Sequence, residues 1–313
     1  MSYRPSARQL DYFLALAETC HFKQAAIKCN VSQPTLSSQF KLLEDSLGTS
    51  LLERGTGNIS LTAAGEQLLP LARQALESLD NIVAMAEAGQ ENLGGLIRLG
   101  VPPTFGPYFM PYLLPILKAA YPNLQLYIRE DRPNLLEQGL IGGSLDCIIT
   151  PDVFPSDRQD LKTLCHEDLS LAVPASHPLA GVEVIPVDML HGERLLSLSH
   201  GFRLHDDVQA LARAAGAVFS QDYEGTSLDA LRQMVSIGMG LALFPASYIA
   251  SEFGKEPDLV LKSVEGVKMR RTICVCWRQG SSRAEQFNVL FDLCRHAVEN
   301  MQIVGIELAD ETS

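Results

Sequence analysis

The stretch that decides the fold of the N-terminal region is residues 31–48, which read VSQPTLSSQFKLLEDSLG. Ser32 is a good N-cap, and Pro34 falls in the first helical turn, where its missing N–H costs nothing. Apolar residues recur along the stretch at helical spacing: Leu36, Phe40, Leu43 and Leu47. The pattern predicts an amphipathic helix with one buried face, which Gly48 ends.

Two shorter amphipathic segments precede this helix. Ser6 and Gln9 have the spacing of a capping box, which predicts a helix start. The apolar residues of this first helix are Leu10, Phe13, Leu14 and Ala17. Those of the second helix are Phe22, Ala25, Ala26 and Cys29. After the third helix, apolar residues 51–52 and 59–61 flank the turn 55–58, which predicts a hairpin-like wing.

Two short helices, a tight turn and a third helix with a polar face describe a helix-turn-helix. That face carries short donors and acceptors suited to base edges and phosphates, among them Gln33 and Lys41. A plain three-helix bundle with a solvated polar face fits the pattern equally well. The periodicity alone does not separate the two interpretations.

The motifs of this segment resemble the winged helix-turn-helix of LysR-type transcriptional regulators. They are Ala25-Ala26, Val31-Ser32-Gln33-Pro34-Thr35-Leu36-Ser37, Leu43-Glu44, Leu47-Gly48, Leu52-Glu53-Arg54 and Leu61-Thr62-Ala63-Ala64-Gly65. The resemblance implies a DNA-binding domain over residues 1–62. The predicted DNA contacts are Ser32, Gln33, Pro34, Thr35, Ser37, Ser38, Lys41 and Arg54. Members usually carry a basic residue where Ser38 stands and a more basic wing, so fewer phosphate contacts are expected here.

Residues 63–92 are predicted to form a linker helix that pairs with a second copy. Its apolar residues are spaced alternately by three and four: Leu69, Ala72, Leu76, Leu79, Val83 and Ala86. This is the seam of a coiled coil, although one helix packed on its own chain has the same pattern. Pro70 falls inside the run and could bend it. Pairing would set two recognition helices against a pseudo-palindromic promoter site, and the family resemblance implies a homotetramer.

Residues 93–313 alternate between strand and helix patterns. Strands at 96–101, 124–128 and 145–150 alternate with helices at 108–121 and 135–142, which predicts a parallel, doubly wound sheet. A second set of strands and helices spans 169–244, and a strand at 271–277 with a helix at 284–300 completes the first set. The fold class is therefore α/β, with two lobes at about 93–168 plus 269–313 and 169–268. This arrangement resembles the effector domain of the same family and periplasmic binding proteins.

Ligands of such folds bind between the lobes, at the carboxyl ends of strands and the starts of helices. The predicted effector contacts are Thr104, Phe105, Thr150, Ser199, His200, Phe202, Arg203, Thr226 and Ser227. Thr104 and Ser227 are expected at helix starts, where free N–H groups favour an anion or a peroxide-sized group. An ordinary N-cap is the plainer interpretation of each of these two residues.

Within the family, residues 96–290 resemble the peroxide-sensing OxyR-type branch. The matching motifs include Pro103-Thr104-Phe105-Gly106-Pro107-Tyr108, Leu145-Asp146-Cys147, Thr226-Ser227-Leu228 and Arg270-Arg271-Thr272-Ile273. That branch has its peroxide-reactive cysteine where this chain has Arg203, and its resolving cysteine near Ala212. The resemblance therefore predicts a regulator without the redox pair.

Arg203 suggests a different chemistry. A guanidinium in a cleft can bind a carboxylate, phosphate or sulfate in a fork, which predicts reversible sensing of a small anion. Pairing of Arg203 with Asp206 or Asp207 on the surface is the equal alternative. Peroxide sensing through other thiols is a further alternative, and most of the seven cysteines are expected to be inert. Cys274 and Cys276 share one face of a strand, which is a weak pattern for a soft metal.

Composition excludes several classes of protein. The 313 residues carry a net charge of −12, split as +1 over residues 1–62, −3 over 63–90 and −10 over the rest. The acidity argues against non-specific coating of nucleic acid, but it belongs to the C-terminal part. The chain has no apolar run that could span a membrane and no signal-peptide pattern, which predicts a cytoplasmic location. No P-loop, GxGxxG after the first strand, HExxH or GxSxG is present, so we expect no enzyme, no cofactor and no metal.

Overall fold

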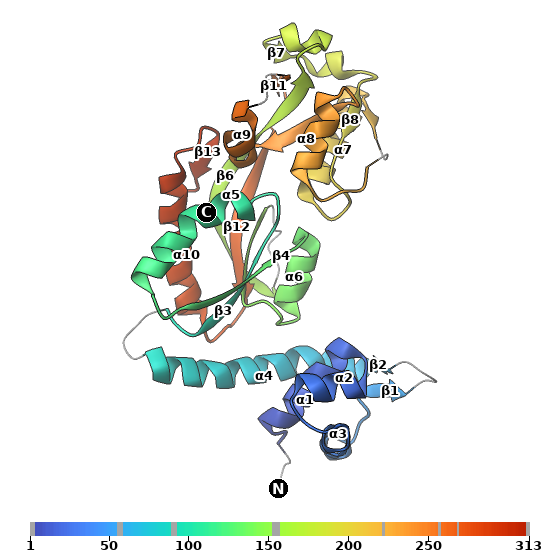
Figure 1. Ribbon diagram of the computed structural model, residues 1–313, viewed down its shortest axis with the longest axis vertical. Helices are drawn as coiled ribbons and strands as arrows, with labels where there is room; N and C mark the ends of the chain where they lie inside the picture. The colour runs from blue at the N-terminus through green and yellow to red at the C-terminus, as the bar shows by residue number, and fades with distance from the viewer. Residues whose placement is uncertain are drawn as a thin grey trace. The chain divides into compact units, whose positions relative to one another are not determined.

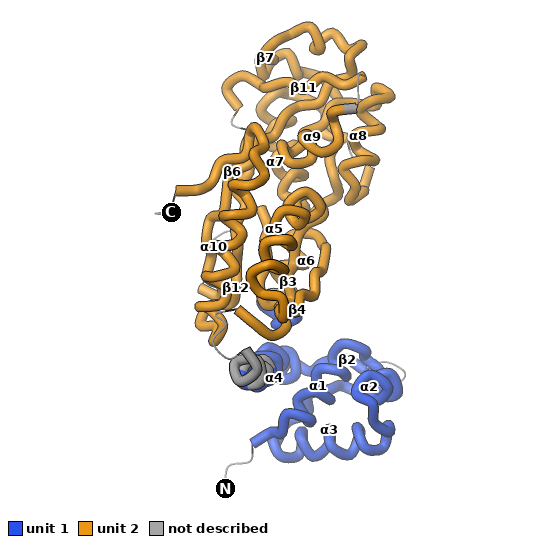
Figure 2. Tube along the Cα trace, turned by 60° about the vertical axis from the view of Figure 1, so that its left-hand side comes forward, with its two compact units in different colours: residues 1–89, 141–144 blue, residues 90–140, 145–313 orange. Residues whose placement is uncertain are grey.

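The structure is a computed structural model that describes residues 4–54, 59–88, 93–151, 157–220, 223–255, 258–267 and 269–310. Figure 2 shows two compact units in different colours. The first comprises residues 1–89 and 141–144, and the second comprises residues 90–140 and 145–313. We call them the DNA-binding unit and the effector domain, and describe each by itself.

The DNA-binding unit contains four helices and a two-stranded hairpin among its described residues (Figure 1). The elements are α1 (Ala7–Thr19), α2 (Phe22–Lys28), α3 (Gln33–Leu47), β1 (Leu52–Arg54), β2 (Ile59–Leu61) and α4 (Ala63–Ala88). β1 and β2 pair antiparallel with Leu52 opposite Leu61, which confirms the wing. The predicted turn at residues 55–58 lies outside the described residues.

Local signals set the helix ends in this unit. Ser6 and Gln9 form the capping box at the start of α1, and Ser32 caps α3 by accepting the N–H of Thr35. Gly48 ends α3 in the left-handed region at φ 65°, as predicted. His21, which merely interrupted the apolar pattern, is the N-cap of α2 through its ring Nδ1.

The core of the unit forms where the three short helices meet. Leu36, Phe40 and Leu43 of α3 are fully buried, and the ring of Phe40 stacks on Phe13 at 6.1 Å. The prediction that Leu47 belongs to the buried face was wrong, because Leu47 is the last residue of α3 and is 38% exposed. Cys29 was expected on the second helix, but it is the C-cap residue that follows α2.

The effector domain is built on a mixed sheet with the strand order β4-β3-β5-β12-β6-β10-β8-β9. We call its first part lobe 1. Lobe 1 contains β3 (Leu96–Val101), α5 (Gly106–Ala120), β4 (Gln125–Glu130), α6 (Pro133–Ile141), β5 (Cys147–Pro151), β12 (Arg270–Arg278), α10 (Ala284–Met301) and β13 (Ile306–Leu308). β3, β4 and β5 are parallel, as predicted, while β12 runs antiparallel to β5. In Figure 1, α5 and α10 lie on one side of the sheet and α6 on the other.

The second part, lobe 2, has its own hydrophobic core. It contains β7 (Val184–Ile185), β8 (Arg194–Leu196), α7 (Arg203–Ala215), β9 (Val218–Phe219), α8 (Leu228–Ser236), β10 (Leu241–Pro245), α9 (Ala246–Glu252), β11 (Leu259–Val264) and three short 3₁₀ turns (Pro178–Gly181, Val187–Leu190 and Phe253–Lys255). The long strand β6 (Gln159–Pro174) passes through both lobes. Its residues up to Asp168 pair with β12, and those from Leu169 pair with β10.

Several elements of this domain were not predicted. No clear sequence pattern predicts α9, β11 or β13, which are short and depend on pairing with β6 or packing against it. No helix among the described residues is long and apolar enough to cross a membrane.

Candidate functional site

The first candidate site is the polar face of α3. Ser32, Pro34 and their neighbours form an exposed surface opposite the buried Leu36, Phe40 and Leu43. Its exposed members are Ser32, Gln33, Pro34, Thr35, Ser38 and Lys41. Ser37 is half-buried, and Arg54 lies in β1 with its side chain outside the described residues. The structure therefore brings the predicted residues of α3 to one accessible face.

Three hydroxyls on this face are already engaged in local bonds. Ser32 Oγ lies 3.3 Å from the N–H of Thr35 and 2.7 Å from Thr35 Oγ1. Ser38 Oγ donates to the carbonyl of Thr35 at 3.0 Å. These bonds stabilise the first turn of α3. The long, exposed side chains of Gln33 and Lys41 are then the ones that can extend from this face toward DNA.

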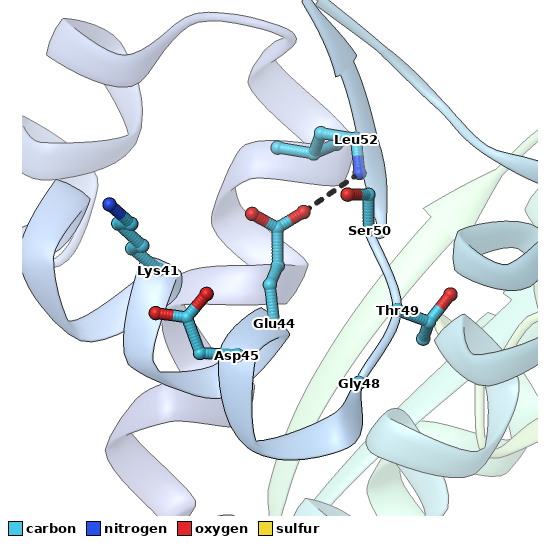
Figure 3. Close-up of a pocket in the computed structure, with 7 residues that line it drawn as sticks. All are labelled: Lys41, Glu44, Asp45, Gly48, Thr49, Ser50 and Leu52. Atoms are coloured by element: carbon cyan, nitrogen blue, oxygen red, sulfur yellow. Dashed lines mark hydrogen bonds between the residues drawn. The ribbon is translucent and has the colours of Figure 1, made fainter.

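Glu44 connects α3 to the wing, a role that no sequence pattern predicted. Its Oε1 accepts the backbone N–H of Leu51 at 2.7 Å and of Leu52 at 3.3 Å. Figure 3 shows this carboxylate reaching from α3 to the start of β1 across a shallow hollow. The hollow is lined by Lys41, Glu44, Asp45, Gly48, Thr49, Ser50 and Leu52. Because two carboxylates and a helix C-terminus face it, it is unsuited to a phosphate.

The second candidate site lies where the two lobes of the effector domain join. At its centre is a buried ion pair between Arg271 of β12 and Glu167 of β6, at 2.8 Å. Arg271 also donates to Thr104, to the hydroxyl at 3.1 Å and to the carbonyl at 2.9 Å. Glu167 accepts the backbone N–H of Ser247, the second residue of α9, at 2.8 Å. The buried ion pair therefore contacts both lobes: Glu167 bonds to Ser247 of lobe 2, and Arg271 bonds to Thr104 of lobe 1.

Three buried hydroxyls near strand ends have no hydrogen-bond partner among the described residues. Thr150 is the penultimate residue of β5 in lobe 1, while Ser199 follows β8 and Ser247 follows β10 in lobe 2. Each is at most 6% exposed. A buried hydroxyl without a partner is unfavourable by about 1–3 kcal/mol, so each of these hydroxyls would be stabilised by a polar partner such as water or a ligand.

The start of α6 in lobe 1 contacts the loop that leads into α7 in lobe 2. Arg132 Nη1 lies 3.5 Å from the carbonyl of His200. Gly201 has φ 95°, and a Cβ at this position would lie 2.8 Å from Asn134 Oδ1. Burial raises the pKa of Glu137 on α6, and the positive charge of Arg203 opposes that rise.

Arg203 itself is the first residue of α7. Its side chain is 31% exposed, and its Nη1 lies 3.6 Å from Asp206 Oδ2. The ion pair with Asp206 was one of the two arrangements considered for this residue. Its partly accessible guanidinium, next to the loop that precedes α7, is also compatible with the other arrangement, a fork for an anion.

The remaining predicted effector residues are dispersed. Phe105 and Phe202 are buried in the cores of lobe 1 and lobe 2. His200 is exposed and stacks on His205 at 5.7 Å. Thr226 and Ser227 are exposed, and Ser227 caps α8 by accepting the N–H of Ala230. Thr104 precedes the N-cap of α5, which is Phe105.

The cysteines of the effector domain are all buried and free: Cys147, Cys165, Cys274, Cys276 and Cys294. Burial raises the pKa of Cys147, Cys165, Cys276 and Cys294. Because the thiolate is the reactive form, burial disfavours reaction of these thiols with oxidants. In the described part of the chain no three His, Cys, Asp or Glu residues form a group that could hold a metal ion.

Comparisons with known proteins agree with this geometry. Residues 7–66 match the family "Bacterial regulatory helix-turn-helix protein, lysR family", and residues 90–299 match "LysR substrate binding domain". The "DNA-binding transcriptional dual regulator OxyR" of Escherichia coli K12 is 37% identical over 288 residues, which cover 92% of this chain and 94% of that protein. The "Hydrogen peroxide-inducible genes activator" of Pectobacterium carotovorum is 37% identical over 295 residues, covering 94% and 96%.

The solved structures agree as well. A cysteine-to-aspartate variant of full-length OxyR from Pseudomonas aeruginosa has a TM-score of 0.79 and 30% identity, and the match covers 99% of this chain and 100% of that one. These relatives are transcriptional regulators and not enzymes. Since the family matches account for both units, the chain belongs to the LysR family of DNA-binding transcriptional regulators with an effector-binding domain.

Proposed function

We propose that this regulator responds to a small anionic molecule, such as a carboxylate, that binds reversibly at the junction of its two lobes. The single observation that carries the proposal is the set of buried hydroxyls of Thr150, Ser199 and Ser247, which lack protein partners among the described residues. They come from both lobes, so a polar ligand that bonded to them would favour one relative placement of the lobes.

Arg203 supplies the charge for such a ligand. It begins α7 directly after the loop that contains Ser199 and His200. The N-terminus of α7 adds a favourable field for a negative group. An anion at Arg203 would displace the contact to Asp206, which is 56% exposed and therefore easily solvated.

The DNA half of the proposal rests on α3. Gln33 and Lys41 are exposed and long enough to reach base edges and phosphates, and the neighbouring hydroxyls position the first turn. Leu79 and Ile82 of α4 are 44% and 65% exposed, which supports pairing of two chains along this helix. A homodimer built in this way, and a homotetramer of two such dimers, would bind a pseudo-palindromic promoter site in the cytoplasm.

The domain division that goes with this function is residues 1–62 for DNA binding, 63–92 for the linker helix and 93–313 for the effector domain. The two lobes of the effector domain would be about 93–168 plus 269–313 and 169–268. The change of strand partner along β6 between Asp168 and Leu169 supports this boundary.

A thermal-shift titration of the full-length protein tests the ligand proposal. The probes are acetate, succinate, benzoate, phosphate and sulfate, with chloride as the ionic-strength control. At least one anion should raise the melting temperature of the wild-type protein, and Arg203→Ala should abolish that rise. Arg213→Ala, on the exposed end of α7, is the matched control and should keep it. An affinity that is equal in wild type and Arg203→Ala would contradict the proposal.

The second candidate function is a response to hydrogen peroxide, which the name of the Pectobacterium relative favours. In this chain such a response would have to use thiols other than the usual pair. Mass spectrometry of all seven cysteines, after treatment with a low concentration of hydrogen peroxide, separates the two functions. The reversible-ligand proposal expects no modification at Cys147 or Cys165, whereas stoichiometric oxidation of either would favour the redox function.

A further inference from the structure

A carboxylate surrounded by arginines lies at the end of lobe 1 where the chain enters the effector domain. Asp146 is 1% exposed, and the guanidinium nitrogens of Arg98, Arg278 and Arg283 lie 3.7–3.9 Å from its oxygens. Its Oδ2 also accepts the backbone N–H of Arg98 at 2.8 Å. We call these four residues the arginine cluster.

Two arginines of the cluster also donate hydrogen bonds to backbone carbonyls. Arg283 donates to the carbonyls of Leu96 at 2.8 Å and Gly94 at 3.1 Å, and its side chain is 5% exposed. Arg278 donates to Leu140 at 2.9 Å and to Leu145. Leu140 lies in the last turn of α6, where the carbonyls carry the negative end of the helix dipole. The cluster thus joins the start of β3 to the end of α6.

The other end of α6 contacts the loop of lobe 2 that precedes α7. Arg132 bonds to the carbonyl of His200, and Asn134 packs against Gly201. Between its two ends α6 is anchored on the sheet by the fully buried Leu136 and Leu140. A rigid helix of nine residues therefore links the junction of the lobes to the arginine cluster.

We propose that α6 is a strut that transmits the position of the 199–202 loop, through the arginine cluster, to residues 94–96. They directly follow Leu93, the first described residue after the linker helix, so any shift in them acts on the chain segment that leads to the DNA-binding unit. Asp146, Arg278 and Arg283 are positioning residues in this role. The inference builds on the proposed function, but its test needs no ligand, so the two can fail separately.

The experiment is hydrogen exchange of the full-length protein, read by mass spectrometry. Arg283→Met should speed exchange about tenfold both at residues 94–99 and in α6, because hydrogen bonds at the strand start are lost and Asp146 loses a buried partner. Arg295→Met is the matched control, because Arg295 lies on α10, which Arg283 precedes as N-cap residue, and like Arg283 it bonds to a backbone carbonyl (Ala309, 2.9 Å) and stacks on a phenylalanine ring. The control should affect residues 306–310 alone.

Gly201→Ala then tests transmission directly. Its new methyl group would press on Asn134 at the far end of α6. It should change exchange at residues 94–99 in the wild-type background and leave it unchanged in the Arg283→Met background. If Arg283→Met does not fold, Arg283→Lys takes its place. This variant keeps the positive charge but cannot donate to the carbonyls of Gly94 and Leu96 as the guanidinium does. A Gly201→Ala effect at 94–99 that persists without the cluster would overturn the proposal, as would no effect in either background.

Discussion

The DNA-binding unit and the effector domain use polar groups in opposite ways. In α3 the hydroxyls of Ser32 and Ser38 bond within three residues along the chain and stay at the surface. In the effector domain the buried Arg271 bonds to Glu167 and to Thr104, which are 104 and 167 residues away. The first unit is therefore held by short-range hydrogen bonds around an apolar core. The second also contains buried charged residues that are far apart in sequence and that only the complete fold brings together.

The largest expected effect comes from breaking the buried ion pair. Arg271→Met leaves Glu167 charged, buried and without its partner, which should lower the free energy of unfolding by about 3–5 kcal/mol. Urea denaturation read by the fluorescence of Trp277, the only tryptophan, reports on lobe 1. The double variant with Glu167→Gln should lose less than Arg271→Met alone. A loss under about 1 kcal/mol in Arg271→Met would show that the junction does not depend on this pair.

A core truncation in α3 sharpens the contrast between the units. Leu36 is fully buried, so Leu36→Ala should destabilise the DNA-binding unit by about 3 kcal/mol. Binding to promoter DNA should fall with it, while the Trp277 transition keeps its midpoint. If the Trp277 midpoint moved as well, the two units would not unfold independently.

The helix cap of α3 predicts a smaller effect. Ser32→Ala removes the acceptor for the N–H of Thr35 and should cost about 1 kcal/mol in the stability of the DNA-binding unit, measured by circular dichroism. Ser38→Ala is the matched control, because Ser38 only donates to a helix carbonyl. It should stay within about 0.5 kcal/mol of wild type. Equal losses in both variants would contradict the capping role of Ser32.

The smallest effect is a pH dependence at Glu137. Burial raises its pKa, so the folded state binds the proton more tightly than the unfolded state does. The stability this gives is present below the ordinary pKa of about 4.3 and is lost as the pH rises through the raised value. Glu137→Gln should therefore match wild type in acid and be more stable at neutral pH, as judged by urea midpoints. A variant that is less stable at neutral pH would mean that attraction to Arg203 outweighs burial.

The same contrast explains how far the sequence alone could lead. The capping box at Ser6, the N-cap at Ser32 and the glycine stop at Gly48 are set by neighbours within a few residues, so the DNA-binding unit could be predicted. In lobe 1 the βαβ order was sufficient to predict the parallel strands.

The polar centre of the effector domain could not be predicted in the same way. Arg271 and Asp146 stood in motifs that matched the family, but nothing near them in sequence indicates a buried ion pair or the arginine cluster. Phe105 and Phe202, two of the predicted effector contacts, are buried in the cores of the two lobes, a placement that an apolar side chain in a loop does not reveal in sequence. Short strands such as β11 and β13 exist through pairing with β6 and carry little pattern of their own.

One measurement tests the central claim most directly: footprinting of the full-length protein on its promoter DNA. One arm adds an anion from the thermal-shift titration, and the other adds a low concentration of hydrogen peroxide. A regulator that works by reversible binding at the lobe junction should change its footprint with the anion and recover on dilution. It should show no change with peroxide. A footprint that changes with peroxide alone, together with oxidation of a cysteine, would contradict the account.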